Sequence, residues 1–444
     1  MARPELSVND LRNLESRIRD KSADIGVVGL GYVGLPLALA FAETGFSVTG
    51  IDADKGRVNK IIRGISYLLD IESPRLKKAV ASGRLKATTS QSALRRVDTI
   101  IICVPTPLTK TKEPDLTYIV GATNDIARFL RLGHLVILES TTYPGTTREI
   151  VLPILESTGL KVGVDYFLTF SPERIDPGSR KFTIRNTPKI VGGMEPTSTK
   201  LAALLYRHVS DKVLEVSTPE VAEMDKVFEN VFRSVNIALV NELAKLCEKM
   251  NINVWEVIKS ASTKPFGYMP FYPGPGVGGH CIPLDPYYLA SKAREYFFHT
   301  RFIELAAEIN ETMPEYIVER IVGALNTRRK SVMGAKILIL GVAYKKDIED
   351  MRESPALRVI ELLVEKKAVV QYHDPYIQNI KEGNRRLKSI KLEGKVLSYY
   401  DCVVIVTDHS CYDLKSVVKD SKLVFDTRGC TVGIDSTNII RLGE

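Results

Sequence analysis

Short apolar runs alternate with amphipathic stretches along most of the chain. The runs lie at residues 25–28, 47–51, 99–104, 134–138, 166–170 and 189–193 in the first half, and at 336–340, 369–373, 402–406 and 423–425 in the second. Runs of this length between turn residues are typical of buried strands in a parallel sheet, and the stretches between them are typical of helices. The pattern therefore predicts an α/β protein with one doubly wound sheet in each half.

A mainly helical stretch separates the two halves. The triplet Thr218-Pro219-Glu220 combines a cap, a proline and an acid, which is typical of a helix start, and the helical pattern continues to about Lys249. A short amphipathic pattern at 7–21 precedes the first strand. We expect four parts: an N-terminal amphipathic helix at 1–22, a first doubly wound domain at 23–216, a central helical domain at 217–325 and a second doubly wound domain at 326–444.

The first strand runs into a glycine-rich turn, Gly29-Leu-Gly-Tyr-Val-Gly34, which precedes a helical pattern. At this spacing Gly29 and Gly31 permit a tight turn and the close approach of a pyrophosphate, while Gly34 lets the helix pack on the strand. The next strand ends at Asp52, whose carboxylate would accept hydrogen bonds from ribose hydroxyls and repel a 2′-phosphate. The sequence therefore predicts a dinucleotide site that favours NAD over NADP, although the nearby Arg57 leaves that choice open. A purely structural glycine turn is the alternative.

Polar residues follow several strands of the first half, at the carboxyl ends where doubly wound sheets bind ligands. They are Thr106, Ser140, Thr141 and Glu173. Any one of them could instead cap the helix that follows its strand. Because several such ends face one crevice, we expect at least two of these side chains to contact a ligand.

The stretch from Phe271 to Pro286 holds four glycines and four prolines, and it carries Cys281 and Asp285. A bend of this composition indicates a loop whose backbone lies close to a ligand and exposes the thiol to it. The alternative is a buried cysteine with a structural role. In the preceding long helix, Lys226 and Asn230 are four residues apart and project from one face. They could bind an oxyanion or form a solvated stripe.

Composition and charge narrow the class of protein. The chain has 444 residues, of which 44% are apolar and 26% charged, as expected of an ordinary soluble protein with about three domains. Its formal charge of +8 is spread along the chain, so a phosphorylated small molecule fits better than nucleic acid. The six cysteines show no CxxC spacing, and neither a signal peptide nor a membrane span is indicated. We expect a cytoplasmic protein with no metal and no membrane partner.

Six motifs, in order along the chain, resemble the UDP-glucose/GDP-mannose dehydrogenase family over about residues 25 to 429. They are GLGYVGLPLA at 29–38, VPTPL at 104–108, ESTTYPGT at 139–146, SPERIDPG at 171–178, GPGVGGHCIPLDP at 274–286 and GVAYKKDIEDMRESPA at 341–356. The stretch at 263–272 is most similar to the branch that acts on UDP-N-acetylglucosamine. The resemblance implies two Rossmann-like domains joined by a central helical domain with a long connecting helix, the C-terminal domain binding UDP.

The resemblance also implies a reaction, the four-electron oxidation of a sugar C6 alcohol to a carboxylate by two NAD. Cys281 would add to the intermediate aldehyde and then carry the thioester that water hydrolyses. Lys226 and Asn230 would stabilise the oxyanion, and Asp285, a water held by Thr141, and Glu173 would handle protons and hydrolysis. The implied NAD contacts are Gly29, Gly31, Tyr32, Val33, Gly34, Asp52, Arg57, Pro105, Thr106, Thr141 and Arg352. The implied substrate contacts are Glu173, Lys226, Asn230, Lys264, Phe271, Tyr272, Gly274, Gly276, Gly278, Tyr344, Lys345 and Arg428.

Two departures from the family pattern bear on the sugar. Pro177 stands where the UDP-glucose enzymes usually carry a second glutamate, and Leu284 stands where they place a lysine. Both weaken an assignment to UDP-glucose and suggest room for an N-acetyl group. Lys264 is a candidate to replace the arginine that a neighbouring subunit lends to this site.

We therefore expect a dehydrogenase of UDP-N-acetylglucosamine that acts as a homodimer through the central helix and supplies a uronic acid for a surface polysaccharide. UDP-N-acetylmannosamine and UDP-glucose are the near alternatives for the substrate. A two-electron β-hydroxyacid dehydrogenase and a non-enzymatic NAD-binding regulator are the more distant ones.

Overall fold

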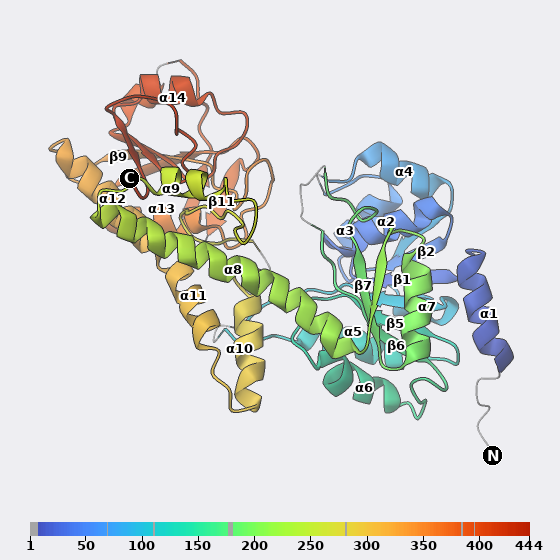
Figure 1. The fold of residues 1–444 in the computed structure, drawn as a ribbon. Helices are drawn as coiled ribbons and strands as arrows, with labels where there is room; N and C mark the ends of the chain where they lie inside the picture. The colour runs from blue at the N-terminus through green and yellow to red at the C-terminus, as the bar shows by residue number, and fades with distance from the viewer. Residues whose placement is uncertain are drawn as a thin grey trace. The chain divides into compact units, whose positions relative to one another are not determined.

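The computed structural model describes residues 8–68, 70–109, 112–175, 181–279, 282–382, 385–394 and 396–444, which form two compact units (Figure 1). The first unit comprises the chain up to Glu229 together with Tyr287–Phe297. The second comprises Asn230–Pro286 and Phe298–Glu444. Each unit contains its own sheet and core.

An eight-stranded sheet forms the centre of the first unit, in the order β3-β2-β1-β4-β5-β6-β7-β8. Its strands are β1 Asp24–Val28, β2 Ser47–Ile51, β3 Leu85–Thr88, β4 Thr99–Ile102, β5 Leu135–Leu138, β6 Phe167–Phe170, β7 Lys189–Gly193 and β8 Val213–Val216. The central strands are buried on both faces, as their continuous apolar runs predict. The order places β1 and β4 side by side as parallel strands, and the order in which successive strands are added reverses between them, which is where such sheets bind ligands.

Helices cover both faces of this sheet. They are α1 Val8–Arg19, α2 Gly34–Thr44, α3 Lys55–Ile62, α4 Ser73–Ala81, η1 Gln91–Arg96, α5 Thr117–Ala127, η2 Thr147–Val151, α6 Leu152–Glu156 and α7 Pro196–Tyr206. The unit also contains α10 Asp285–Glu295 from Tyr287 onward. One core contains the apolar side of α2 and part of α7, and a second core lies under α5 and α6.

Two strands of this sheet, β7 and β8, run opposite to the other six and so depart from the parallel arrangement that the sequence predicts. β7 pairs with β6 in the antiparallel direction, through Thr169↔Gly193 and Phe170↔Gly192, whereas all other pairs are parallel. No helix separates β6 from β7 in the described chain, so no crossover returns the chain to the starting edge. The first residue of β7, Lys189, therefore lies at the edge where β5 and β6 end.

The long helix α8 runs from Pro219 to Lys249 without a break (Figure 1). Its start and end agree with the sequence pattern. Residues through Glu229 belong to the first unit and those from Asn230 to the second.

A five-stranded parallel sheet in the order β10-β9-β13-β14-β15 forms the centre of the second unit. Its strands are β9 Lys336–Leu340, β10 Val369–His373, β13 Cys402–Ile405, β14 Val424–Asp426 and β15 Ile439–Arg441, and a hairpin is formed by β11 Asn379–Glu382 and β12 Arg385–Lys388. The helices are α9 Val254–Ala261, α11 Arg301–Glu311, α12 Met313–Thr327, α13 Pro355–Glu365, η3 Val396–Tyr399 and α14 Leu414–Asp420. The predicted fold class, two Rossmann-like sheets with a helical region between them in the chain, is confirmed.

Among the described residues, no helix has the length and apolar character needed to cross a membrane.

Candidate active site

The glycine turn after β1 has the geometry that a dinucleotide requires. Gly29 has a φ of +91°, and a Cβ there would lie 2.5 Å from the carbonyl oxygen of Cys103. A Cβ on Gly34 would collide with the carbonyl oxygen of Gly29. A Cβ on Gly31 would meet nothing within 4 Å, which is the open space that a pyrophosphate would need. Tyr32 is exposed and Val33 is half-buried on the same turn.

At the end of β2, Asp52 is buried and fixed by the backbone. Its carboxylate accepts hydrogen bonds from the N–H of Leu30 (2.7 Å) and of Asp54 (2.8 Å). Arg57 lies 3.5 Å from Asp52 and 3.6 Å from Asp54, so its charge is shared between two carboxylates. The local charge at the ribose position is therefore negative, which favours hydroxyl donors over a 2′-phosphate.

The polar residues that follow β4 and β5 converge at one edge of the first sheet. The Ser140 hydroxyl donates to the carbonyl oxygen of Val104 (2.8 Å), and Thr141 follows it directly. Pro105 is exposed and Thr106 is buried. The carbonyl oxygen of Thr106 accepts a hydrogen bond from the Tyr288 hydroxyl (2.5 Å), which comes from α10. Sequence reasoning did not identify Tyr288, because a tyrosine on a helical pattern is usually part of the core.

Glu173, after β6, is buried with its charge compensated. One oxygen accepts hydrogen bonds from the N–H of Arg174 (2.7 Å) and Ile175 (2.8 Å), and the other lies 3.3 Å from the ammonium of Lys189. Burial works against the ionised form, but Lys189 and the two N–H groups outweigh it and lower the pKa of Glu173. The carboxylate is therefore ionised near neutral pH, as a general base must be.

The buried face of α8 carries polar residues among its apolar ones. The polar residues are Glu223, Lys226, Asn230, Ser234 and Asn241, all buried and spaced by three, four or seven residues. Lys226 and Asn230, taken from the sequence as either an oxyanion site or a solvated stripe, are thus not solvated. Lys226 makes no hydrogen bond or ion pair with any residue that the structure describes.

Glu223 joins α8 to the loop that carries Thr141, and sequence reasoning missed it. Its carboxylate accepts hydrogen bonds from the N–H of Gly145 (2.6 Å) and of Thr147 (2.8 Å) and from the Thr147 hydroxyl (2.7 Å). Burial raises the pKa of Glu223 to about 7, against the lowering effect of these donors. The only signal in the sequence was its position three residues before Lys226 on the same helical face.

In the second unit, Asn230 donates a hydrogen bond to the carboxylate of Asp285, 2.5 Å away. Asp285 is 1% exposed and begins α10, four residues after Cys281. Two residues predicted as catalytic from separate stretches of the sequence are therefore in direct contact.

The glycine-rich stretch before Cys281 is fixed at both ends within the second unit. The N–H of Gly274 donates to the Asn241 side chain (2.9 Å), and the N–H of Gly279 donates to the carbonyl oxygen of Arg352 (2.9 Å). Gly276 has a φ of +122°, and a Cβ on Gly278 would lie 2.7 Å from Tyr344. No other residue type fits these positions without movement. Cys281 itself, with His280 and Pro177, lies outside the described residues.

The predicted UDP contacts lie around this stretch. A Cβ on Gly274 would lie 2.8 Å from the Arg428 guanidinium, which also donates to the carbonyl oxygen of Val406 (2.8 Å). Burial lowers the pKa of Arg428. Tyr272 stacks on Trp255 with ring centroids 6.4 Å apart. Tyr344 and Lys345 are half-buried on the loop after β9.

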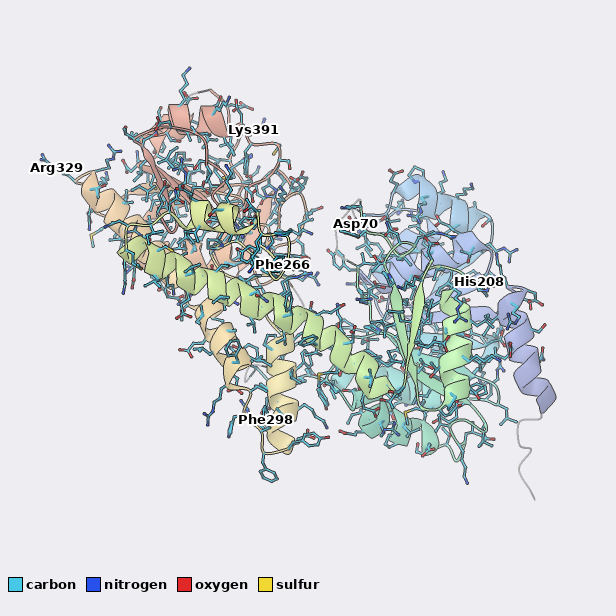
Figure 2. All side chains as sticks on the ribbon, in the orientation of Figure 1. Asp70, His208, Phe266, Phe298, Arg329 and Lys391 are labelled. Atoms are coloured by element: carbon cyan, nitrogen blue, oxygen red, sulfur yellow. The ribbon has the colours of Figure 1, made fainter. Side chains whose placement is uncertain are left out.

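Three further residues predicted as contacts belong to the second unit. Lys264 is exposed, with its ammonium over the ring of Phe266, which projects from the surface (Figure 2). Phe271 contacts Phe232 of α8, with ring centroids 5.8 Å apart. Arg352 pairs with Asp350 (2.6 Å).

Among the described residues, no group of three or more His, Cys, Asp or Glu side chains could hold a metal ion.

Comparison with known proteins places three family models in sequence along the chain. The NAD-binding domain of the UDP-glucose/GDP-mannose dehydrogenase family matches residues 23–210, its central domain matches 220–312 and its UDP-binding domain matches 338–432. The chain is 39% identical to UDP-N-acetyl-D-glucosamine 6-dehydrogenase of Pseudomonas aeruginosa, over 80% of this chain and 84% of that protein. It is 38% identical to UDP-N-acetyl-D-mannosamine dehydrogenase of Pyrococcus horikoshii, over 94% of this chain and 96% of that protein. The solved structure of the UDP-D-ManNAc dehydrogenase from Pyrococcus horikoshii superposes with a TM-score of 0.86 at 36% identity, covering 95% of this chain and 99% of that one.

Proposed function

Because the chain belongs to the UDP-glucose/GDP-mannose dehydrogenase family and is an NAD-dependent UDP-sugar dehydrogenase, we propose that it oxidises the C6 alcohol of UDP-N-acetyl-D-glucosamine to the uronic acid. The observation that carries this proposal is the contact between Asn230 and Asp285, which joins the buried polar residues of α8 to the segment that carries Cys281. The resemblance found in the sequence is confirmed at the level of the family, and so are NAD as the cofactor and the class of enzyme.

In the proposed reaction, the glycine turn and Asp52 would hold NAD⁺, which would supply the hydride acceptor for each of two oxidations of the sugar. Between them the Cys281 thiolate adds to the C6 aldehyde, and the second oxidation leaves a thioester on the same sulfur. Lys226 and Asn230 donate hydrogen bonds to the oxygen on C6 as it gains negative charge, and Thr141 holds a water beside it. Glu173 takes a proton from the water that attacks the thioester, the carbon–sulfur bond breaks, and the thiolate is restored.

The choice of sugar follows from two lines of support. The relative that acts on UDP-N-acetyl-D-glucosamine is 39% identical, and Leu284, beside Asp285, replaces a cation with an apolar side chain in the sugar-binding segment. The mannosamine epimer is the second candidate, because the 38% identical mannosamine relative covers more of the chain. UDP-glucose is the third.

We expect UDP-N-acetyl-D-glucosamine to give the highest kcat/KM in a panel with UDP-N-acetyl-D-mannosamine and UDP-glucose, measured by NADH absorbance. A pocket that accommodates an N-acetyl group should lose about 10-fold or more in kcat/KM for UDP-glucose, since apolar contacts to two carbons contribute about 1–3 kcal/mol. Two NADH per UDP-sugar consumed are expected, because the product is the acid. A single NADH with release of the aldehyde would instead support the two-electron alternative, and a preference for the mannosamine epimer would reverse the order of the first two candidates.

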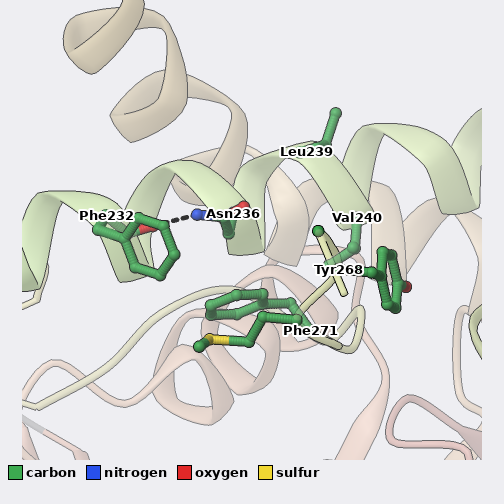
Figure 3. A pocket seen from close by; sticks show the side chains of 8 residues that line it. Phe232, Asn236, Leu239, Val240, Tyr268 and Phe271 are labelled. Carbon is green, nitrogen blue, oxygen red and sulfur yellow. Dashed lines mark hydrogen bonds between the residues drawn. The ribbon is translucent and has the colours of Figure 1, made fainter. Parts of the chain in front are cut away.

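We also propose that the protein is a homodimer through the central helix. The exposed face of α8 carries Phe232, Leu239 and Leu246 at seven-residue intervals, each more than 40% exposed. This spacing is typical of a helix–helix seam. Beside it lies an apolar pocket of ≈ 430 Å³ lined by Phe232, Asn236, Leu239, Val240, Gly267, Tyr268, Met269 and Phe271 (Figure 3). The side chains of a second copy would fill such a pocket, and aromatic and methionine side chains are enriched in protein interfaces.

We expect Leu239→Asp to convert the dimer to a monomer at micromolar concentration, because the substitution places a charge in the centre of the apolar seam. Sedimentation velocity measures the change. Lys391→Asp, at an exposed lysine of the second unit (Figure 2), is the matched control and should leave the mass unchanged. A wild-type protein that sediments as a monomer would contradict the proposal directly.

The proposal includes three further expectations. The chain is divided into four parts, at 1–22, 23–216, 217–325 and 326–444. The protein is cytoplasmic, and it takes part in making a surface polysaccharide. The family-model ranges 23–210, 220–312 and 338–432 support a division of this kind.

A further inference from the structure

A buried cluster of ionisable groups lies where β5 and β6 end and β7 begins, and the reaction described above uses only one of them. The ammonium of Lys189 lies 2.7 Å from a carboxylate oxygen of Glu139 and 3.3 Å from one of Glu173. The Tyr206 hydroxyl donates to the same oxygen of Glu139 (2.5 Å), and the Cys103 thiol lies 3.9 Å from the other. Lys189 thus connects Glu139, which is 1% exposed, with Glu173.

The reversed strand β7 is the reason that the cluster exists. The antiparallel register, continued by three residues from Phe170↔Gly192, brings Lys189 opposite Glu173. In a parallel pairing, the first residue of β7 would lie at the far edge of the sheet. The sequence therefore predicted Glu173 at a ligand-binding edge but not the cation that pairs with it.

The cluster holds two carboxyl groups and one ammonium, and the groups have different environments. Glu173 gains two backbone donors as well as Lys189, and its pKa is lowered despite burial. Burial raises the pKa of Glu139, although Lys189 and Tyr206 oppose that shift, and the pKa of Cys103 is raised well above its usual range by burial and by Glu139. The contacts of Glu173 therefore favour its ionised form, whereas burial works against the ionised form of Glu139.

Arg174 does not substitute for Lys189. Its guanidinium makes hydrogen bonds with the Glu229 carboxylate and donates to the carbonyl oxygen of Pro188 (2.7 Å). Within the described chain, Lys189 is the side-chain cation that hydrogen-bonds to the Glu173 carboxylate.

We propose that Lys189, anchored by Glu139 and Tyr206, is a positioning residue that keeps Glu173 ionised and aimed for hydrolysis of the thioester. This inference rests on the proposed role of Glu173. In that step the water oxygen bonds to the thioester carbon, the carboxylate of Glu173 accepts one proton from the water, and the carbon–sulfur bond breaks to release the Cys281 thiolate. No electrons are exchanged in it. The function of Lys189 is thus confined to hydrolysis and does not extend to either hydride transfer.

The test separates hydrolysis from oxidation in Lys189→Met, supplied with NAD⁺ and UDP-N-acetyl-D-glucosamine. We expect a burst of about two NADH per site followed by steady turnover at least about 10-fold slower than wild type, and a sugar adduct on Cys281 visible by mass spectrometry of the intact protein. Loss of the cation raises the pKa of Glu173, so the acidic limb of the kcat profile should move to higher pH. The ratio kcat/KM should stay within about 2-fold, because the steps up to formation of the thioester are unchanged, and Lys189→Arg should restore most of the rate.

Because Lys189→Met leaves Glu139 buried without its partner, the double variant Glu139→Gln/Lys189→Met is tested beside it. The double variant removes both charges and should show the same adduct and the same slow turnover. The inference is overturned if either variant folds and hydrolyses the thioester at the wild-type rate, or loses activity without accumulating the adduct. The variant Glu173→Gln separates the role of Lys189 from the proposed role of Glu173. If Glu173→Gln accumulates the adduct and the Lys189 variants do not, only the role of Lys189 is wrong. If Glu173→Gln does not accumulate the adduct, the proposed role of Glu173 is wrong as well.

Discussion

Cys281→Ser is expected to lose the four-electron oxidation almost completely while NAD binding persists. A serine hydroxyl is a far weaker nucleophile than a thiolate, and a serine ester is hydrolysed more slowly than a thioester, so steady-state NADH production should fall at least about 10²-fold. The dinucleotide turn lies in the first unit, whereas the anchors of the glycine-rich stretch before Cys281 lie in the second, so the Kd for NAD measured by calorimetry should stay within about 2-fold.

Cys411→Ser is the matched control, because Cys411 is an exposed cysteine of the second unit. It should retain the wild-type rate. If Cys281→Ser produced the uronic acid as fast as the wild type, covalent catalysis at this position would be wrong, and the glycine-rich stretch would have to serve the binding of the sugar alone.

Features that depend on backbone shape could be predicted well from the sequence. Gly29 and Gly276 adopt the positive φ angles that make glycine necessary, and the strand ends at Asp52 and Glu173 lie where the alternating pattern places them. Each of these signals is local, since a turn of this kind or a strand end is set by a few neighbouring residues.

Features that depend on pairing between distant segments could not be predicted. The direction of β7 decides where Lys189 lies, and nothing within 189–193 differs between a parallel and an antiparallel strand. The same holds for the loop contacts of Glu223 and Tyr288, which depend on how α8 and α10 pack against the strand ends.

The helix α8 shows why hydrophobic periodicity alone was ambiguous. Its buried positions include Glu223, Lys226 and Asn230 beside apolar residues such as Val227, and its exposed positions include Phe232 and Leu239, so polar and apolar residues occur on both faces. A polar residue is buried where it binds a ligand, and an apolar residue is exposed where it meets another chain.

The aspartate that follows the second strand differs in its hydrogen bonds and burial between the two sheets. Asp52, after β2, accepts two backbone hydrogen bonds and is 8% exposed. Asp374, after β10, is fully buried and accepts hydrogen bonds from the N–H groups of Val342 and Ala343 and from His409. Asp374 thus fixes the loop that carries Tyr344 and Lys345, and the corresponding position in the first sheet retains contact with solvent.

Lys226→Met is expected to separate catalysis from stability. Lys226 is 9% exposed, and within the described chain its side chain makes no hydrogen bond or ion pair that a substitution would remove. Methionine fills a similar volume without a charge, and the thermal midpoint should stay the same or rise. Activity, in contrast, should fall. Removing one hydrogen-bond donor to a developing oxyanion lowers kcat by about 10²–10³-fold, which corresponds to about 2.7–4 kcal/mol of transition-state stabilisation.

The control for this substitution is Lys249→Met, at the exposed end of the same helix, which should change neither kcat nor the thermal midpoint by more than a small amount. Calorimetric unfolding and steady-state NADH production measure the two quantities on the same preparations. A lower thermal midpoint with unchanged kcat would mean that Lys226 is a structural cation and that Asn230 stabilises the oxyanion without it. A fall in kcat with no loss of stability is the result expected of a charge that the fold keeps buried for the transition state.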